Sequence, residues 1–171
     1  MLQIRVLVGD VLEVGSGPGA NAQAIVERFP GIRLTATDVD EAMVSAARRR
    51  LEGIDEVIAV RRANITALPF EDDSVDAVVS LLMLHHVIDW ETGLAECLRV
   101  LRPGGVLAGY DLLDTAPSRL LHRIDRSEHR MIAAVDLEAR LNELRMGDIR
   151  VSSGLGGLVA RFSAVKASGR I

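Results

Sequence analysis

The sequence predicts an α/β fold, in which a doubly wound, mostly parallel sheet of about seven strands ends in an antiparallel hairpin. Three observations support this prediction. Short apolar runs alternate with segments of helical spacing, a glycine loop joins the first run to the first helix, and no helix separates the last two strand-like segments. A chain of 171 residues, 49% apolar and 26% charged, fits one folded domain over residues 1–171.

The elements are expected in regular order along the chain. Strands are expected at residues 11–14, 33–37, 57–61, 75–80, 106–111, 149–153 and 158–166. Helices are expected at residues 21–29, 41–51, 91–101, 116–131 and 137–144, and Asp40 is the expected cap of the second. A turn at residues 154–157 joins the last two strands into the hairpin.

A glycine loop at residues 15–19 links the first strand to the first helix. Gly15, Gly17 and Gly19 permit a sharp turn and let a ligand approach the backbone closely. A loop that presents its ligand to a helix N-terminus is typical of nucleotide sites. The loop therefore predicts a ligand that contains a nucleoside.

The same residues fit two nucleotide patterns. Gly15-x-Gly17-x-x-Ala20, followed by Asp38, satisfies the dinucleotide fingerprint. Counted from Glu13, the loop also satisfies the pattern acid-x-Gly-x-Gly-x-Gly. An acidic side chain beside the loop would repel a pyrophosphate and attract a cationic amino acid group. An NAD-dependent oxidoreductase is one alternative, and a non-catalytic cofactor-binding or partner domain is another.

Three further runs extend the second pattern: Leu68-Pro-Phe70, Leu84-His-His-Val87 and Leu101-Arg-Pro-Gly-Gly105. Together with the glycine loop, they make the sequence resemble the Rossmann-like, type 11-like S-adenosylmethionine-dependent methyltransferases. The resemblance runs from residue 11 to residue 111, with weaker support to residue 166. It implies an enzyme that uses S-adenosyl-L-methionine and methylates an unidentified small-molecule acceptor by in-line displacement.

The candidate cofactor residues lie where strands end, because ligands of open parallel sheets bind beyond the carboxyl ends of the strands. Asp38 ends the second strand, and its carboxylate can accept hydrogen bonds from both ribose hydroxyls. The resemblance implies that Val39 presses on the adenine ring. It also implies that Asn64, in place of the family's Asp, accepts from the adenine amino group. The full predicted set is Glu13, Gly15, Ser16, Gly17, Gly19, Asp38, Val39, Asn64, Ile65, Ser80 and Leu81.

The acceptor side has candidates but no assigned catalytic residue. His85, His86 and Asp111 are candidates for a general base, although adjacent histidines point to different sides and cannot both face one ligand. No metal site is expected, because the histidines lack further ligands at metal-binding spacing.

A stripe of arginines at helical spacing is a separate candidate: Arg119, Arg123, Arg126 and Arg130. We hypothesise that Arg123 and Arg126 bind an anionic acceptor. The alternative is a solvated helix face.

Composition limits the remaining possibilities. The net charge of −4 argues against a general nucleic-acid binder, and no apolar run is long enough to span a bilayer. Cys97 is the single cysteine, expected to be buried and inert, and it excludes an intrachain disulfide, which favours a cytoplasmic location. Residues 1–9 carry no signal-peptide pattern and precede the first strand without the helices that cover the site in similar enzymes. The start is therefore truncated, or the site is open, or a partner covers it, as in a homodimer.

Overall fold

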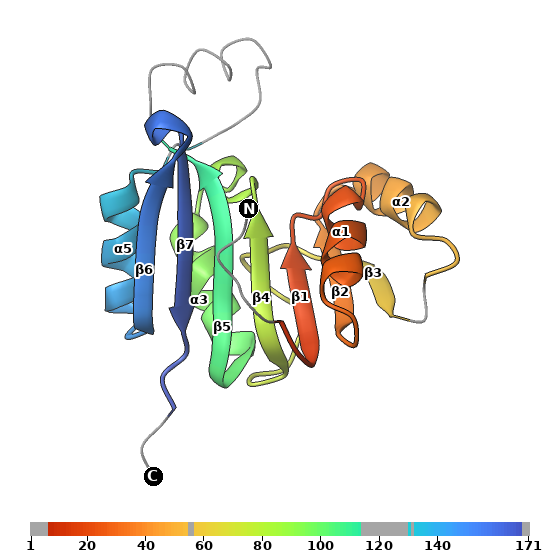
Figure 1. The fold of residues 1–171 in the computed structure, drawn as a ribbon, viewed down its shortest axis with the longest axis horizontal. Helices are drawn as coiled ribbons and strands as arrows, with labels where there is room; N and C mark the ends of the chain where they lie inside the picture. Colours follow the sequence, from red (N-terminus) through yellow and green to blue (C-terminus); the bar gives the residue numbers. More distant parts are fainter. Residues whose placement is uncertain (1–6, 55–56, 114–129, 131, 169–171) are drawn as a thin grey trace.

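The computed structural model describes residues 7–54, 57–113, 130 and 132–168, and a seven-stranded sheet forms its centre (Figure 1). The strands are β1 (Asp10–Val14), β2 (Arg33–Asp38), β3 (Ile58–Arg62), β4 (Val75–Leu81), β5 (Leu101–Leu112), β6 (Gly147–Gly154) and β7 (Val159–Val165). The helices are α1 (Ala20–Arg28), α2 (Glu41–Arg50), α3 (Trp90–Val100) and α5 (Ala134–Glu143), with short 3-10 turns η1 (Leu84–His86) and η2 (Leu155–Gly157).

The sheet order β3-β2-β1-β4-β5-β7-β6 confirms the predicted architecture. The first five strands are parallel to their neighbours, and β7 is antiparallel to both β5 and β6, as the expected hairpin requires. The expected helix at residues 116–131 falls almost entirely outside the described residues. The expected strand at residues 106–111 is part of a longer one, because β5 already begins at Leu101 with a register shift against β4.

Helices cover both faces of the sheet, which gives two hydrophobic clusters. On one face, α3 and α5 pack against side chains that include Leu12, Val78 and Leu107. On the other face, α1 and α2 pack against side chains that include Val11 and Leu34. Since adjacent residues of β1 point to opposite faces, the strand is buried on both sides from Val11 to Val14, with Glu13 as the polar residue among apolar ones.

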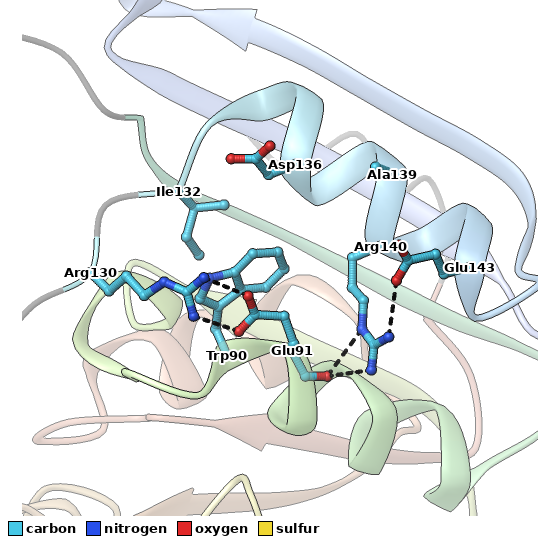
Figure 2. A pocket seen from close by; sticks show the side chains of 8 residues that line it. All are labelled: Trp90, Glu91, Arg130, Ile132, Asp136, Ala139, Arg140 and Glu143. Atoms are coloured by element: carbon cyan, nitrogen blue, oxygen red, sulfur yellow. Dashed lines mark hydrogen bonds and ion pairs between the residues drawn. The ribbon is translucent and has the colours of Figure 1, made fainter.

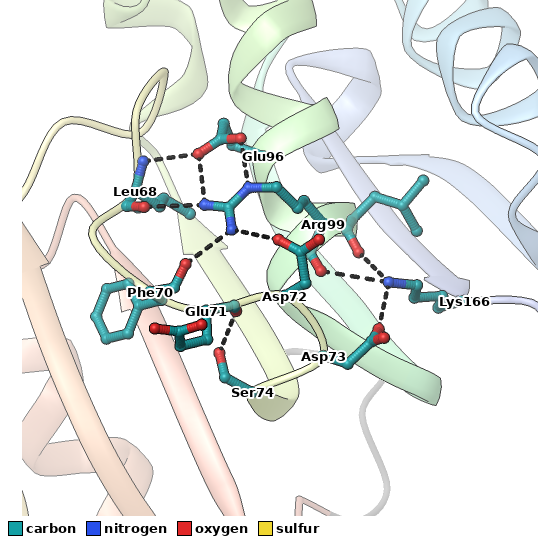
Figure 3. Close-up of polar contacts among 10 residues, drawn as sticks. Leu68, Phe70, Glu71, Asp72, Asp73, Ser74, Glu96, Arg99 and Lys166 are labelled. Carbon is teal, nitrogen blue, oxygen red and sulfur yellow. Dashed lines mark hydrogen bonds and ion pairs between the residues drawn. The ribbon is translucent and has the colours of Figure 1, made fainter.

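Arg99 on α3 holds the loop between β3 and β4 through hydrogen bonds and ion pairs (Figure 3). Its guanidinium donates to the carbonyls of Leu68 and Phe70 at 2.9 and 2.7 Å and pairs with Glu96 and Asp72 at 2.7 and 2.8 Å. Glu96 in turn accepts a hydrogen bond of 2.8 Å from the Leu68 amide. The network thus fixes the loop that follows Asn64, Ile65 and Thr66 against α3.

The structure also bears on the expectations for Cys97 and for membrane-spanning helices. Cys97 is fully buried within α3, which confirms the expected burial, and this burial raises the pKa of its thiol to about 12. No helix among the described residues is long and apolar enough to cross a membrane.

Candidate functional site

A cleft of about 830 Å³ opens at the carboxyl ends of β1 to β4. Strand β1 has β2 on one side and β4 on the other, so the cleft lies at the topological switch point of the sheet. Its walls come from the glycine loop, the ends of β2 and β3, and the connection between β4 and α3. Six predicted cofactor residues line it: Gly15, Gly17, Asp38, Val39, Asn64 and Ile65.

The three loop glycines all have positive φ angles but meet different surroundings. A Cβ on Gly15 would lie 2.6 Å from Cβ of Met83, and one on Gly19 would lie 3.2 Å from Ala47 of α2. A Cβ on Gly17 would meet no atom within 4 Å. Gly15 and Gly19 therefore allow close packing of protein on protein, whereas Gly17 leaves its backbone open to a ligand.

Asp38 and Asp40 have separate tasks at the end of β2. One Asp38 carboxylate oxygen accepts from the Gly17 amide at 2.9 Å, and the other accepts from the Asp40 amide at 3.0 Å. The Asp40 carboxylate accepts from the Ala42 amide at 2.8 Å, which confirms Asp40 as the cap of α2. Asp38 thus lines the cleft and ties the glycine loop to β2.

The neighbouring wall at the end of β3 carries Asn64 and Ile65. The carbonyl oxygen of the Asn64 side chain accepts from both the amide and the hydroxyl of Thr66, each at 3.0 Å. Both lone pairs of that oxygen are therefore engaged within the loop, and the side-chain NH₂ is the group left for a ligand. The expected contact of Asn64 with adenine remains a prediction, with a donor rather than an acceptor available.

The other predicted cofactor residues lie behind the cleft surface. Glu13, Ser16, Gly19, Ser80 and Leu81 are all buried. Both carboxylate oxygens of Glu13 and the hydroxyls of Ser16 and Ser80 have no hydrogen-bond partner among the described residues. Burial, with a smaller contribution from the charge of Asp38, raises the pKa of Glu13 to about 8. These buried polar groups lie at the ends of β1 and β4 that flank the switch point.

The wall formed by the β4–α3 connection was missed by sequence reasoning. Leu82, Met83, Val87 and Ile88 line it, and the side chain of Leu82 is 41% exposed. Leu82 has a φ of 56°, an uncommon angle for a non-glycine residue, and its amide donates to the Tyr110 carbonyl at 2.9 Å. The pair His85-His86 is the polar motif in this segment, and the apolar residues around it give no sign of which of them face a cleft.

The two adjacent histidines face different surroundings, as expected. His85 is buried, and its Nδ1 contacts the carboxylate of buried Asp111 on β5. His86 is exposed and lines the cleft. The two rings are in contact, with centroids 4.1 Å apart and planes tilted by 43°. The structure therefore brings all three candidate general bases together, with one of them at the cleft surface.

Arg130 is the member of the predicted arginine stripe that the structure describes, since Arg119, Arg123 and Arg126 lie outside the described residues. Its guanidinium pairs with both oxygens of Glu91 at 2.6 and 2.8 Å and lies over the ring of Trp90 at 5.7 Å (Figure 2). These contacts line a separate pocket of about 410 Å³ beside α5. Within residues 7–54, 57–113, 130 and 132–168, no group of three or more His, Cys, Asp or Glu could hold a metal ion.

Comparisons with known proteins agree on one kind of domain. A family model described as a methyltransferase domain matches residues 12–109. The demethylmenaquinone methyltransferase of Clavibacter sepedonicus is 42% identical over 95 residues, which are 56% of this chain and 38% of that protein. The ubiquinone/menaquinone biosynthesis C-methyltransferase UbiE of Geobacter sulfurreducens is 35% identical over 161 residues, which are 92% of this chain and 55% of that protein. The chain thus spans between 38% and 55% of the length of these two relatives.

A solved structure supports the fold. Phosphoethanolamine N-methyltransferase 2 of Haemonchus contortus, in complex with S-adenosyl-L-methionine, superimposes with a TM-score of 0.83 at 16% identity. The match covers 97% of this chain and 50% of that one. At this identity the likeness establishes the Rossmann-like arrangement of strands and helices.

Proposed function

Because this chain belongs to the Rossmann-like family of S-adenosylmethionine-dependent methyltransferases, whose domain model matches more than half of it, we propose that it transfers the sulfonium methyl group of S-adenosylmethionine to an apolar small molecule. Residues 1–171 act in this proposal as one cofactor-binding domain. The positive sulfur already activates the methyl group, so the protein's work is to align the acceptor with methyl and sulfur and to exclude water.

Asp38 is the main support for the proposed cofactor site. After accepting from Gly17 and Asp40, each of its oxygens keeps a lone pair directed at other donors. Two such oxygens match the two adjacent hydroxyls of a ribose. Val39, 57% exposed within the cleft, offers an apolar contact for the adenine ring beside it.

The same geometry argues for a sulfonium rather than a dinucleotide. A pyrophosphate needs backbone amides that point at it, and the Gly17 amide already donates to the Asp38 carboxylate. The Asp38 carboxylate at the cleft surface would repel a pyrophosphate, whereas Glu13 behind it is buried and, with its pKa raised to about 8, adds no negative charge at pH 7. No finding favours the NAD-dependent oxidoreductase or the non-catalytic domain, and the relatives described above are named as methyltransferases.

The acceptor is proposed from the wall opposite the adenosine residues. Leu82, Met83, Val87 and Ile88 give this wall an apolar surface beside His86 and Asp89, which suits an apolar ring with a polar group, and the Asp89 carboxylate does not suit a phosphorylated acceptor. The names of two relatives refer to quinone substrates, which have this character. The single cysteine supports a reducing, cytoplasmic setting.

Calorimetric titration with S-adenosylhomocysteine tests the cofactor site. Asp38→Ala removes two charge-assisted hydrogen bonds and should weaken binding by roughly tenfold to a hundredfold. Glu138→Ala, an exposed carboxylate on α5, is the matched control and should bind like the wild type. Equal affinities for Asp38→Ala and wild type would remove Asp38 from the site, and failure of the wild type to bind would end the proposal.

The acceptor class is tested by product formation with S-adenosylmethionine. An alkyl-substituted 1,4-naphthohydroquinone, kept reduced, should give a methylated product by mass spectrometry, whereas phosphoethanolamine should give none. Methylation of phosphoethanolamine alone would contradict the apolar acceptor while leaving the cofactor site standing.

A further inference from the structure

The contact between His85 and Asp111 is a buried polar pair directly behind the cleft. Both side chains are almost completely shielded from solvent, at 3% and 4% exposure. Removing such groups from water costs free energy unless their hydrogen-bonding groups are satisfied. The pair lies where β4 and β5 end, on the same edge of the sheet as the cleft.

The surroundings of Asp111 fix the orientation of His85. One carboxylate oxygen accepts from the Leu84 amide at 2.6 Å, and the other accepts from the Leu112 amide at 2.7 Å and contacts Nδ1 of His85. An ionised carboxylate can only accept, so Nδ1 of His85 carries the hydrogen. The imidazole of His85 is therefore held in one tautomer and one orientation.

His86 is the exposed neighbour of this fixed ring. Its ring lies against that of His85, and its amide donates to the Met83 carbonyl at 3.0 Å. From the other side, the Arg130 amide donates to the His85 carbonyl at 2.8 Å. The turn η1 is thus tied to β5 and to residue 130, and it presents the His86 imidazole to the cleft from a rigid support.

Resting on the proposed methyl transfer, we infer that His86 is the general base of the reaction and that His85 and Asp111 are positioning residues for it. His86 accepts the proton of the acceptor's hydroxyl group as the acceptor attacks the methyl carbon. The oxygen of that hydroxyl group forms a bond to the methyl carbon while the carbon–sulfur bond breaks, and the electron pair of the broken bond stays on sulfur as the neutral thioether of S-adenosylhomocysteine. The imidazolium of His86 then returns its proton to solvent.

The charges around His86 favour this role. Asp89 follows on the same segment, Asp38 and Asp40 line the same cleft, and Asp111 lies behind His85. The guanidinium of Arg130 is the nearby cation among the described residues, and Glu91 neutralises it. The described lining of this cleft thus carries three carboxylates and no lysine or arginine, which suits a group that becomes cationic when it takes up a proton.

Turnover of the naphthohydroquinone probe tests the base. His86→Asn should lower kcat by about 10²- to 10⁴-fold and leave the affinity for S-adenosylhomocysteine unchanged. The fall of kcat on the acid side of the pH profile, which reports protonation of the base, should vanish in this variant. His86 is exposed, so His86→Asn should fold like the wild type.

The pH profile of kcat tests whether His85 and Asp111 position His86. Asp111→Asn should move the acid limb of the profile to lower pH, because loss of a negative charge lowers the pKa of a nearby imidazole. Glu138→Gln, which removes an exposed carboxylate on α5 outside the cleft, is the matched control and should leave that limb in place. An acid limb unmoved in a folded Asp111→Asn protein would remove His85 and Asp111 from the mechanism.

The outcomes separate this inference from the proposed function. Retention of kcat and of the acid limb by His86→Asn would overturn the inference while methyl transfer stands. A wild type that binds S-adenosylhomocysteine but leaves hydroxyl acceptors unmethylated would also overturn it, with the cofactor site intact. A wild type that does not bind the cofactor product would overturn the proposed function and the inference together.

Discussion

Glu13 on β1 and Asp38 on β2 are electrostatically coupled carboxyl groups beside the glycine loop. Burial is the main cause, and the charge of Asp38 the second, of the rise in the pKa of Glu13 from 4.5 to about 8. The Glu13 carboxyl group has no hydrogen-bond partner among the described residues, whereas the Asp38 carboxylate accepts from two backbone amides. One carboxyl group is therefore neutral at pH 7 and the other is positioned to receive donors.

The first prediction concerns how stability depends on pH. Between pH 4.5 and about 8 the folded protein keeps the Glu13 proton that the unfolded chain has lost, so the free energy of unfolding falls as pH rises through this range. In Glu13→Gln this contribution is absent, and the slope should be flatter. Urea denaturation at several pH values measures it, with Glu138→Gln as the control that keeps the wild-type slope. Parallel slopes in all three proteins would contradict a neutral Glu13.

The second prediction uses two glycines with open surroundings. Gly17 and Gly31 have φ angles of 52° and 92°, and a Cβ on either would meet no atom within 4 Å. Each Gly→Ala change should therefore cost about 1 kcal/mol of folding stability or somewhat more through backbone strain. Gly17→Ala should in addition weaken binding of S-adenosylhomocysteine, because its methyl group would extend into the cleft.

Urea denaturation and calorimetric titration distinguish the two effects. Gly31→Ala serves as the control for strain without a ligand contact, since Gly31 lies outside the cleft. If Gly17→Ala and Gly31→Ala bound the cofactor product equally well, the backbone at Gly17 would not be a ligand contact.

The third prediction concerns the strained residue of the apolar wall. Leu82 and Arg145 share a φ of 56°, but Arg145 is exposed outside the cleft. Arg145→Gly should stabilise the protein by about 0.5–1 kcal/mol, the gain from relieved strain less the entropy cost of glycine. Leu82→Gly gains the same relief but loses a wall of the acceptor site, so the KM for the naphthohydroquinone should rise. An unchanged KM would show that Leu82 does not contact the acceptor.

Much of the fold could be predicted from the sequence, because strands and helix starts follow from patterns within a few residues. Buried parallel strands are continuous apolar runs, and a helix start such as Asp40 is marked by a single capping side chain. The glycine loop was recognised for the same reason, since its spacing is fixed within a few residues. The strand ends differ by up to two residues, apart from the early start of β5 at Leu101.

The wall of the cleft between β4 and α3 could not be predicted from the sequence. Leu81 and Leu82 are neighbours of the same type, yet Leu81 is buried in the sheet and Leu82 enters the cleft. The left-handed backbone at Leu82, held by its hydrogen bond to Tyr110 of β5, rotates the chain at this point. No residue pattern near Leu82 predicts its left-handed backbone.

The sequence by itself determined the order of strands and helices, the loop at residues 15–19 and the carboxylate that follows β2, because each depends on spacing within one segment. Tertiary structure alone decided that His85 pairs with Asp111, 26 positions away, and that His86 faces the cleft. Both outcomes depend on β4 and β5 lying side by side in a particular register. That register is set by packing over the whole sheet, which no short stretch of sequence encodes.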